Sequence, residues 1–262
     1  MSGRHALIVG VSGVAAATAC ALALGGHITH LTLLYRSRLE EAQALQSALL
    51  APPHSLAAVL LLQADVRSDA EVRQAFAASL AAHGPAHYVV NCAGATRKVE
   101  LSDLEGATDD LWHSLYDTNV VGAFHVTRAA AAPGAVPRGG AIVNISSVAG
   151  RLAQGSSLPY ACSKAALDCL TAAMARTLGP QGVRVLGVAP GFIAGEWLES
   201  LLGEGFEAAR SAYAAALPLR SVCTPEDVAS VVVALLTSAA LMTGQTVVVD
   251  GGMCVAGFAA TL

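Results

Sequence analysis

The stretch HALIVG, from His5 to Gly10, decides the fold that we expect for this chain. A short apolar run that ends at a glycine is typical of a buried strand followed by a tight turn. Small residues then continue from about Gly13 to Leu24 in a pattern that favours a helix. The beginning of the chain is therefore predicted to be a strand, a turn and a helix.

The same alternation continues along the rest of the chain. Further buried strands are expected at residues 31–35, 59–64, 88–92, 141–145, 183–189 and 246–249. Helices are expected between them, at residues 38–50, 69–82, 108–131, 159–178 and 225–238. Continuously apolar strands that alternate with helices predict a parallel sheet covered on both faces. No linker or repeat divides residues 1–262, so we predict one doubly wound α/β domain with about seven strands.

Composition agrees with this fold class and limits the classes of binding partner that we expect. The chain has 262 residues, of which 54% are apolar and 13% charged, enough for a core on both faces of a sheet. A net charge of −4 without a basic run argues against nucleic acid or an anionic membrane as a partner. The apolar run from Val14 to Leu24 is too short to span a bilayer and follows a strand rather than a charged leader. We therefore expect a cytoplasmic protein.

The six cysteines are scattered and form no C-x-x-C pair, and no histidine stands at metal-ligand spacing from them. Neither a disulfide framework nor a metal site is therefore expected. Buried free thiols are the simpler interpretation.

The first turn is a candidate phosphate-binding loop. In a doubly wound sheet a ligand binds at the carboxyl ends of the strands, near the point where the strand order reverses. Gly10 and Gly13 stand at G-x-x-G spacing, with Ala16 where a third glycine might pack helix on strand. This pattern would bring the backbone close to a pyrophosphate, but an ordinary strand-to-helix turn has the same appearance.

The end of the second strand bears on the choice of cofactor. Tyr35-Arg36-Ser37-Arg38 contains no carboxylate to accept hydrogen bonds from a ribose 2′-hydroxyl, whereas Arg36 could pair with a 2′-phosphate. This favours NADP(H) over NAD(H). A solvated helix entrance would also explain Arg36 and Arg38.

Two further strand ends would face the same ligand. Asp65-Val66 follows the third strand, where it would meet an adenine edge. Asn91-Cys-Ala-Gly94 ends the fourth strand in small residues that would let the backbone pass close to a cofactor. Taken singly, each is explained equally well by an Asx turn or an ordinary strand end.

Tyr160 and Lys164 form the candidate catalytic pair. On a helix, their i, i+4 spacing places the phenol and the ammonium on one face, where the cation would favour the phenolate. Ser147 stands thirteen residues before Tyr160, and Asn119 stands twenty-eight residues before Ser147. An isolated Tyr-x-x-x-Lys is common by chance, so the spacing to these other residues carries the argument.

These residues, in this order, closely resemble the short-chain dehydrogenase/reductase family over essentially the whole chain. The matching features are the Gly-rich first turn, Asp65-Val66, NCAG at 91–94, Asn119, IVNISS at 142–147, Tyr160-Ala-Cys-Ser-Lys164, Pro190-Gly191 and TGQTVVVDGG at 243–252. The combined spacing is highly specific. The resemblance implies a Rossmann fold and an oxidoreductase.

The resemblance also implies roles for the catalytic residues. Tyr160 would be the general acid that protonates a carbonyl oxygen as hydride arrives, or the base in the reverse direction. Lys164 would hydrogen-bond the nicotinamide ribose and, with the charge of the oxidised ring, lower the pKa of Tyr160. Ser147, selected over Ser146 by its spacing, would hold the carbonyl oxygen. Asn119 would distort its helix and anchor a water in a proton relay to Lys164.

By the same resemblance, a nicotinamide cofactor would lie along the carboxyl edge of the sheet, with NADP(H) favoured and NAD(H) possible. The residues expected to contact it are Gly10, Ser12, Gly13, Val14, Arg36, Asp65, Val66, Asn91, Ala93, Gly94, Tyr160, Lys164, Pro190, Gly191 and Ile193.

Two features depart from the family pattern. Val9 stands where a Thr is usual, and only two residues separate Gly10 from Gly13 where the family usually has three. Gly195 stands where relatives often have a Thr after Pro-Gly. The contact to the nicotinamide carboxamide would then come from the backbone near Ile193.

An insert near residues 192–217 is the candidate substrate lid. Glutamates alternate there with the apolar residues Trp197, Leu198, Leu201, Leu202 and Phe206. We expect two short amphipathic helices that form an apolar lid, although packing against the body of the protein explains them equally well. An apolar pocket would suit a hydrophobic ketone or an acyl thioester.

The expected assembly and function follow from the resemblance. Helix 108–131 and the Lys164 helix resemble the pair through which relatives dimerise, and the last strand with Gly251-Gly252 resembles a second interface, so we expect a homo-oligomer, a tetramer or a dimer. The preferred function is NADP(H)-dependent reduction of a carbonyl, similar to 3-oxoacyl-carrier-protein reductases. The alternative is a catalytically weak or inactive nucleotide-binding or assembly protein, which the altered glycine turn would favour.

Overall fold

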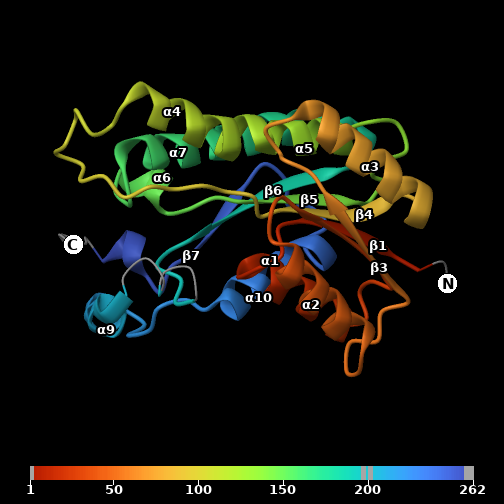
Figure 1. The fold of residues 1–262 in the computed structure, drawn as a ribbon, viewed down its shortest axis with the longest axis horizontal. Helices are drawn as coiled ribbons and strands as arrows, with labels where there is room; N and C mark the ends of the chain where they lie inside the picture. Colours follow the sequence, from red (N-terminus) through yellow and green to blue (C-terminus); the bar gives the residue numbers. More distant parts are fainter. Residues whose placement is uncertain (1–2, 196–198, 200–202, 257–262) are drawn as a thin grey trace.

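A seven-stranded parallel sheet forms the centre of the computed structural model, which describes residues 3–195, 199 and 203–256. The strand order is β3-β2-β1-β4-β5-β6-β7, and helices cover both faces (Figure 1). The predicted fold class is therefore confirmed. Among the described residues, none of the helices combines the length and the apolar character needed to cross a membrane.

The first half of the chain contains β1 (His5–Val9), α1 (Val14–Leu24), β2 (His30–Tyr35), α2 (Leu39–Leu50), β3 (Ala58–Gln63), α3 (Asp69–His83) and β4 (Ala86–Asn91). The second half contains α4 (Asp109–Tyr116), the π-helix η1 (Asp117–Val121), α5 (Gly122–Ala130), β5 (Ala141–Ile145), α6 (Ala149–Leu152), α7 (Leu158–Leu178), η2 (Gly179–Gln181), β6 (Arg184–Pro190), η3 (Gly203–Gly205), α9 (Phe206–Ala216), α10 (Pro225–Thr237), β7 (Thr246–Val249) and η4 (Met253–Val255). Every predicted strand is present with its ends moved by at most a few residues. Helix α6 was not predicted.

The strand order reverses between β1 and β4. Strand β1 pairs with β2 on one side and with β4 on the other, so the chain crosses the sheet after β3 and continues outward through β5, β6 and β7. Such a reversal leaves a crevice at the carboxyl ends of the central strands, because the connections on its two sides run in opposite directions. The loops after β1, β4 and β5 therefore meet there.

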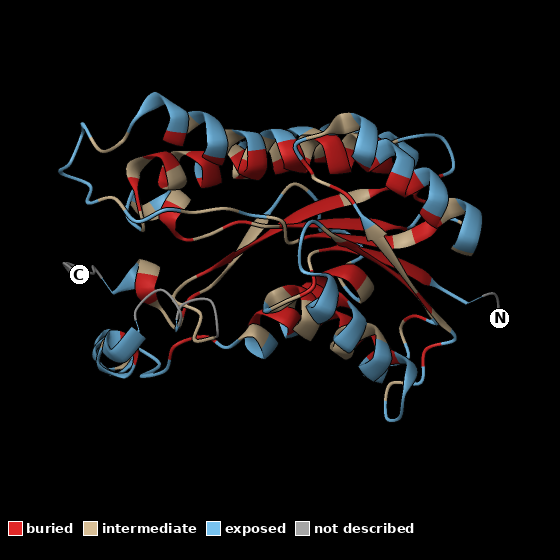
Figure 2. Ribbon diagram, in the orientation of Figure 1, coloured by how far each residue is buried: buried red, intermediate tan, exposed pale blue. Residues whose placement is uncertain are grey.

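The core consists of two apolar layers, one on each face of the sheet. Helices α3, α4, α5 and α7 cover one face and α1, α2 and α10 the other, and the buried residues lie between these layers (Figures 1 and 2). Along β1, Ala6 and Ile8 belong to one layer, whereas Leu7 and Val9 belong to the other. Because successive side chains of a strand point to opposite faces, burial on both faces requires the continuous apolar run that the sequence has.

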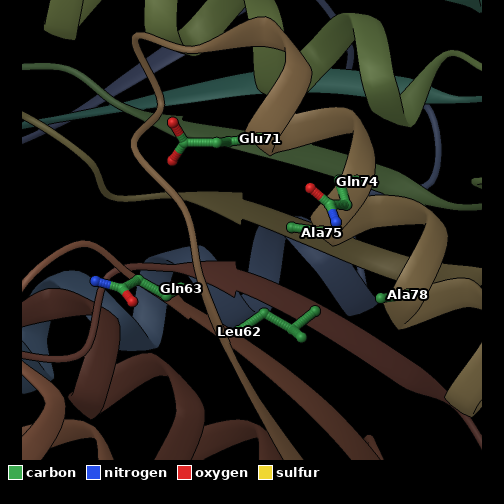
Figure 3. Close-up of a pocket in the computed structure, with 6 residues that line it drawn as sticks. All are labelled: Leu62, Gln63, Glu71, Gln74, Ala75 and Ala78. Carbon is green, nitrogen blue, oxygen red and sulfur yellow. The ribbon is translucent and has the colours of Figure 1, made fainter.

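A hollow lies at the β3 edge of the sheet, beside α3. It is lined by Leu62, Gln63, Glu71, Gln74, Ala75 and Ala78 (Figure 3). None of these residues belongs to the predicted site.

A buried histidine lies at the amino end of β1. His5 is fully buried, its Nδ1 lies 3.0 Å from Gly84 O, and its Nε2 lies 3.0 Å from Thr32 Oγ1. The ring of His83 contacts it edge-on at a centroid distance of 5.2 Å. Burial disfavours the charged ring and lowers the pKa of His5 to about 4. The folded protein therefore keeps this imidazole neutral.

We predict that His5 contributes to loss of stability in acid. Its folded pKa lies below the unfolded value, so between pH 6.5 and about pH 4 the unfolded chain binds a proton that the folded chain excludes. The free energy of unfolding should fall over this window, with about 3 kcal/mol from His5. His5→Gln should flatten this slope in urea titrations at a series of pH values, whereas His113→Gln, at an exposed position, should not. Equal slopes for His5→Gln and the unchanged protein would contradict the prediction.

Candidate active site

Helix α7 carries Tyr160 and Lys164. Ser157 begins it, because its hydroxyl accepts a hydrogen bond from Tyr160 N at 3.4 Å, and Pro159 occupies the first turn, where its missing N–H costs nothing. Tyr160 therefore lies in the first turn, and Lys164 follows one turn later on the same face. The Lys164 Nζ atom lies 5.8 Å from the centroid of the Tyr160 ring.

The ammonium of Lys164 is buried at the end of β5. Its Nζ donates a hydrogen bond to Ile145 O at 2.9 Å. Burial disfavours the charged form and lowers the pKa of Lys164 to about 8, while the nearby Cys92 and Asp168 act in the opposite direction. The group therefore stays mostly protonated at neutral pH.

Tyr160 is partly buried and hydrogen-bonds to the hydroxyl of Ser147. Burial raises its pKa above the usual value, and the Ser147 hydrogen bond offsets this only in part. The expected lowering of the Tyr160 pKa is therefore not found in the protein chain alone. The physical reason is the burial of the phenol, and the ammonium of Lys164 donates to Ile145 O.

The two neighbouring serines face different partners. Ser147 Oγ accepts a hydrogen bond from Ala149 N at 3.2 Å and reaches Tyr160. Ser146 is buried, and its hydroxyl donates to Lys164 O at 3.2 Å. The structure therefore brings Ser147 to the tyrosine, as the thirteen-residue spacing predicted, while Ser146 holds the backbone of α7.

Asn119 lies in the π-helix η1, so the predicted distortion of its helix is confirmed. Its Oδ1 accepts from Ala95 N at 2.7 Å, and its Nδ2 donates to Ala95 O at 2.9 Å and to Ser163 Oγ at 2.9 Å. The fully buried amide thus ties the loop after β4 to α7. A role in anchoring a relay water stays a prediction.

The turn after β4 approaches the same residues. A Cβ atom at Gly94 would lie 3.5 Å from Lys164 Nζ and 3.6 Å from Asn119 Oδ1. Ala93 packs against the core under α3, α5 and α7. Asn91 is buried, and its Oδ1 has no hydrogen-bond partner within the described part of the chain. The backbone of this turn therefore lies beside Lys164 and Asn119.

The shortened first turn still joins β1 directly to α1. Gly10 and Gly13 have φ angles of 121° and 54°, which favour glycine, and Gly13 is the residue before α1. The backbone amides of Gly13 and Val14 have no acceptor among the described residues. A helix N-terminus with free amides and no acidic side chain in its first turn fits a pyrophosphate.

An arginine other than the predicted one reaches this turn. Arg38 Nη1 donates to Ser12 Oγ at 3.4 Å and to Glu41 Oε2 at 2.9 Å. Arg36 is exposed, and its carbonyl accepts from Gln63 Nε2 at 2.9 Å. From the sequence, Arg38 was interpreted only as part of a solvated helix entrance, because spacing alone does not show which arginine points back to the first turn.

Asp65 and Val66 are engaged within the protein. The carboxylate of Asp65 pairs with Arg67 at 2.5 Å from Nη2, which holds the pKa of Asp65 below its usual range. The side chain of Val66 belongs to the core, and its carbonyl accepts from His125 Nδ1 at 2.8 Å. Only the backbone N–H of Val66 and the partly exposed Asp65 remain for a ligand.

The segment after β6 is positioned by the end of the chain. Gly191 N donates to Val249 O at 2.8 Å, and a Cβ atom at Gly191 would lie 2.9 Å from the Cβ of Asp250. Pro190 is the last residue of β6, and Ile193 forms a bridge with Cys223. Glycine is therefore required at position 191 by this close contact.

The insert is held to the body of the protein through α9. The rings of Tyr213 and Phe192 lie 4.5 Å apart, and both pack on the cluster that contains Leu217 and Met253. Helix α9 therefore packs against the body of the protein, which is one of the two interpretations given for the insert. The first of the two expected helices, with Trp197, Leu198, Leu201 and Leu202, lies outside the described residues.

Comparison with known proteins identifies the family. The family model described as enoyl-(acyl carrier protein) reductase matches residues 9–254. The 3-oxoacyl-[acyl-carrier-protein] reductase of Synechocystis is 34% identical over 97% of this chain and 98% of its own length. A short-chain dehydrogenase/reductase from Serratia marcescens superposes with a TM-score of 0.82 at 27% identity, covering 96% of this chain and 98% of its own.

The chain belongs to the short-chain dehydrogenase/reductase family. A variant of actinorhodin polyketide ketoreductase, solved with NADPH, also superposes on it, with a TM-score of 0.84 at 29% identity over 96% of this chain and 97% of the other. This short-chain dehydrogenase/reductase is therefore an oxidoreductase of a family that uses nicotinamide cofactors.

Three elements of this short-chain dehydrogenase/reductase meet at the first turns of α7. Helix α7 brings Tyr160 and Lys164, the segment after β5 brings Ser147, and the π-helix brings Asn119. Residues 95–99 are joined to the loop before α7, because Val99 N donates to Ser156 O at 2.8 Å. Neither segment has a sequence motif that predicts this contact.

We predict that Asn119→Ala destabilises the protein by about 1–3 kcal/mol, because the polar groups of Ala95 and Ser163 lose their buried partner. Urea unfolding at neutral pH measures this change. Thr177→Ala is the control, since its exposed hydroxyl bonds only within α7 and should cost much less. Equal stability of Asn119→Ala and the unchanged protein would show that the amide does not hold the loop.

Proposed function

We propose that this protein reduces the carbonyl group of a small apolar substrate with NADPH, and oxidises the corresponding alcohol in the reverse direction. The observation that carries this proposal is the contact between Ser147 and Tyr160 beside the buried ammonium of Lys164. The named activities of relatives, a 3-oxoacyl-[acyl-carrier-protein] reductase and a polyketide ketoreductase, support it.

The residues of the first turn would hold the cofactor. The free amides at the start of α1 would bind its pyrophosphate, and Arg38 with Arg36 would bind a 2′-phosphate. Gly94 would let the backbone pass close to the nicotinamide ribose, near Lys164. When bound, NADP(H) supplies the hydride for the reduction.

Tyr160 would deliver the proton. Its raised pKa keeps the phenol protonated at neutral pH, as a general acid in the reduction requires. The Ser147 hydroxyl would bind the carbonyl oxygen beside the phenol, and the positive charge of Lys164 would stabilise the phenolate as the proton leaves. Asn119 would keep the loop after β4 against this group.

An apolar substrate is supported by the residues near the crevice. Leu152, Phe192 and Tyr213 belong to one apolar cluster between α6 and α9. A hydrophobic ketone or an acyl thioester would suit this surface. We also propose that the chain forms a single catalytic unit with residues 192–217 as its lid. We further propose a cytoplasmic location and a homo-oligomer, which would be either a tetramer or a dimer.

The alternative, an inactive nucleotide-binding protein, depended on the shortened first turn. Gly10 and Gly13 nevertheless connect β1 to α1 with free amides at the helix N-terminus. This observation favours a working cofactor site over a damaged one.

We predict that Tyr160→Phe lowers kcat for carbonyl reduction by about 10²–10⁴-fold, because the proton donor is lost. The measurement is NADPH oxidation with a panel of hydrophobic ketones and 3-oxoacyl thioesters. NADPH affinity, followed by fluorescence, should change far less than kcat, and Tyr116→Phe is the control. Full activity of Tyr160→Phe would overturn the assignment of the acid.

We predict that Arg38→Ala weakens NADPH binding at least about tenfold and leaves NADH binding nearly unchanged, because only NADPH carries the 2′-phosphate. Calorimetric titration with each nucleotide measures this, and Arg36→Ala tests the other arginine in the same way. Tighter binding of NADH than of NADPH to the unchanged protein would overturn the preference for NADP(H).

A further inference from the structure

A charged cluster joins α6 to α7 and β7 near the proposed site. Arg151 of α6 donates from Nη2 to Thr246 O at 2.5 Å, and its Nε lies 3.9 Å from Asp168 Oδ2. Thr246 Oγ1 donates to Asp168 Oδ1 at 3.1 Å. We call Arg151, Asp168 and Thr246 the clamp cluster. It connects the helix that follows Ser147 to the helix that carries Lys164.

Helix α6 lies directly on the backbone of α7. A Cβ atom at Gly150 would lie 2.5 Å from Ala165 N and 2.8 Å from the carbonyl carbon of Lys164. A side chain at position 150 would therefore push the two helices apart. This contact places the segment after Ser147 against the helix turn that contains Lys164.

The other end of this segment is attached to the sheet. Ser146 N donates to Val188 O at 2.7 Å, and Val148 N donates to Pro190 O at 3.0 Å. Ser147 thus lies between two backbone contacts to β6, while the clamp cluster holds the following helix. The segment that contains Ser147 is therefore attached on both sides of this residue.

The cluster also depends on a glycine in β6. Gly187 pairs with Thr246, and a Cβ atom at Gly187 would lie 2.5 Å from Thr246 Oγ1. The missing side chain leaves room for the threonine hydroxyl to reach Asp168. Asp168 is one turn beyond Lys164, and its side chain is only 21% exposed.

We propose that the clamp cluster is a positioning device that fixes Ser147 relative to Tyr160 and Lys164. This inference rests on the proposed carbonyl reduction. Proton transfer from Tyr160 to an oxygen held by Ser147 requires both hydroxyls at defined distances, and a misplacement of about 1 Å can cost about 10²-fold in rate. Arg151, Asp168 and Thr246 act through the helices that carry these residues and would not touch the substrate.

One member of the cluster, Asp168, also acts on the charge of Lys164. The groups that face Lys164 or members of the cluster are Cys92 after β4, Tyr160 and Asp168 on α7, Arg151 on α6, and Cys254 near Arg151. The anion of Asp168 stabilises the ammonium of Lys164, so its removal should lower the pKa of Lys164. Removal of Arg151 takes away the cation that lies beside Asp168 and should raise the pKa of Lys164. A purely structural defect has no reason to produce shifts of opposite sign.

The first experiment is kinetic. Arg151→Gln and Asp168→Asn should each lower kcat about tenfold, while the KM for NADPH changes by less than about twofold, because the cofactor contacts are untouched. The pH above which activity falls should move down in Asp168→Asn and up in Arg151→Gln. Arg73→Gln is the matched control, since it breaks a helix ion pair of 2.8 Å with Asp69 on α3 and should change neither quantity.

The second experiment does not require activity. Lys98 and Lys164 are the only lysines in the sequence, so lysine labelled with ¹³C gives two side-chain signals in an NMR titration. Lys98 is exposed and serves as the internal reference, and Lys98→Arg assigns the signals. Lys164 should titrate near pH 8 in the unchanged protein, lower in Asp168→Asn and higher in Arg151→Gln.

The two experiments separate the two proposals. If no carbonyl substrate is reduced but the Lys164 titration shifts in opposite directions, the proposed function fails and the link between the cluster and Lys164 stands. Unchanged kcat in Arg151→Gln and Asp168→Asn, shifts of the same sign, or an equal loss of kcat in Arg73→Gln would overturn the positioning role.

Discussion

Lys164 brings a positive charge into the interior at the end of β5, and the surrounding structure is arranged to tolerate it. The ammonium donates to Ile145 O, Gly94 leaves space beside it, and Asp168 lies one turn further along α7. An isolated buried charge would be costly, because low polarity disfavours it and would drive the group to lose its proton. The turn after β4, the end of β5 and α7 must therefore meet at this point, and Asn119 holds two of them together.

The second constraint is close approach of backbone segments, for which the chain uses glycine. Gly10 and Gly13 allow β1 to pass into α1 without an extra residue, and Gly150 lets α6 lie on α7. In each place a Cβ atom or an ordinary φ angle would move an element that carries or faces the proposed site. The shortened first turn is therefore a different route to the same helix N-terminus, with free amides where an anion would bind.

The sheet was predictable from the sequence because β1 and its neighbours are buried on both faces, which favours apolar residues at most positions. The proximity of Ser147, Tyr160 and Lys164 was predictable because their spacing resembles a known family. The contacts of Arg38 and Val66 and the presence of α6 were harder to predict. The direction of Arg38, the burial of Val66 under His125, and the short helix after Ser147 depend on contacts with distant elements, which local spacing does not record.

By itself, the sequence determined the alternation of strands and helices, the order of the site residues along the chain, and the choice of Ser147 over Ser146. The alternation follows from periodicity, which is a local property, whereas the choice of Ser147 follows from a spacing that resembles the family's. Only the tertiary structure decided the pKa directions of Tyr160 and Lys164, the pairing of Asp65 with Arg67, and the joining of α6, α7 and β7 through Arg151, Asp168 and Thr246. Burial and long-range contacts exist only once the sheet has assembled, because they join residues far apart in the chain.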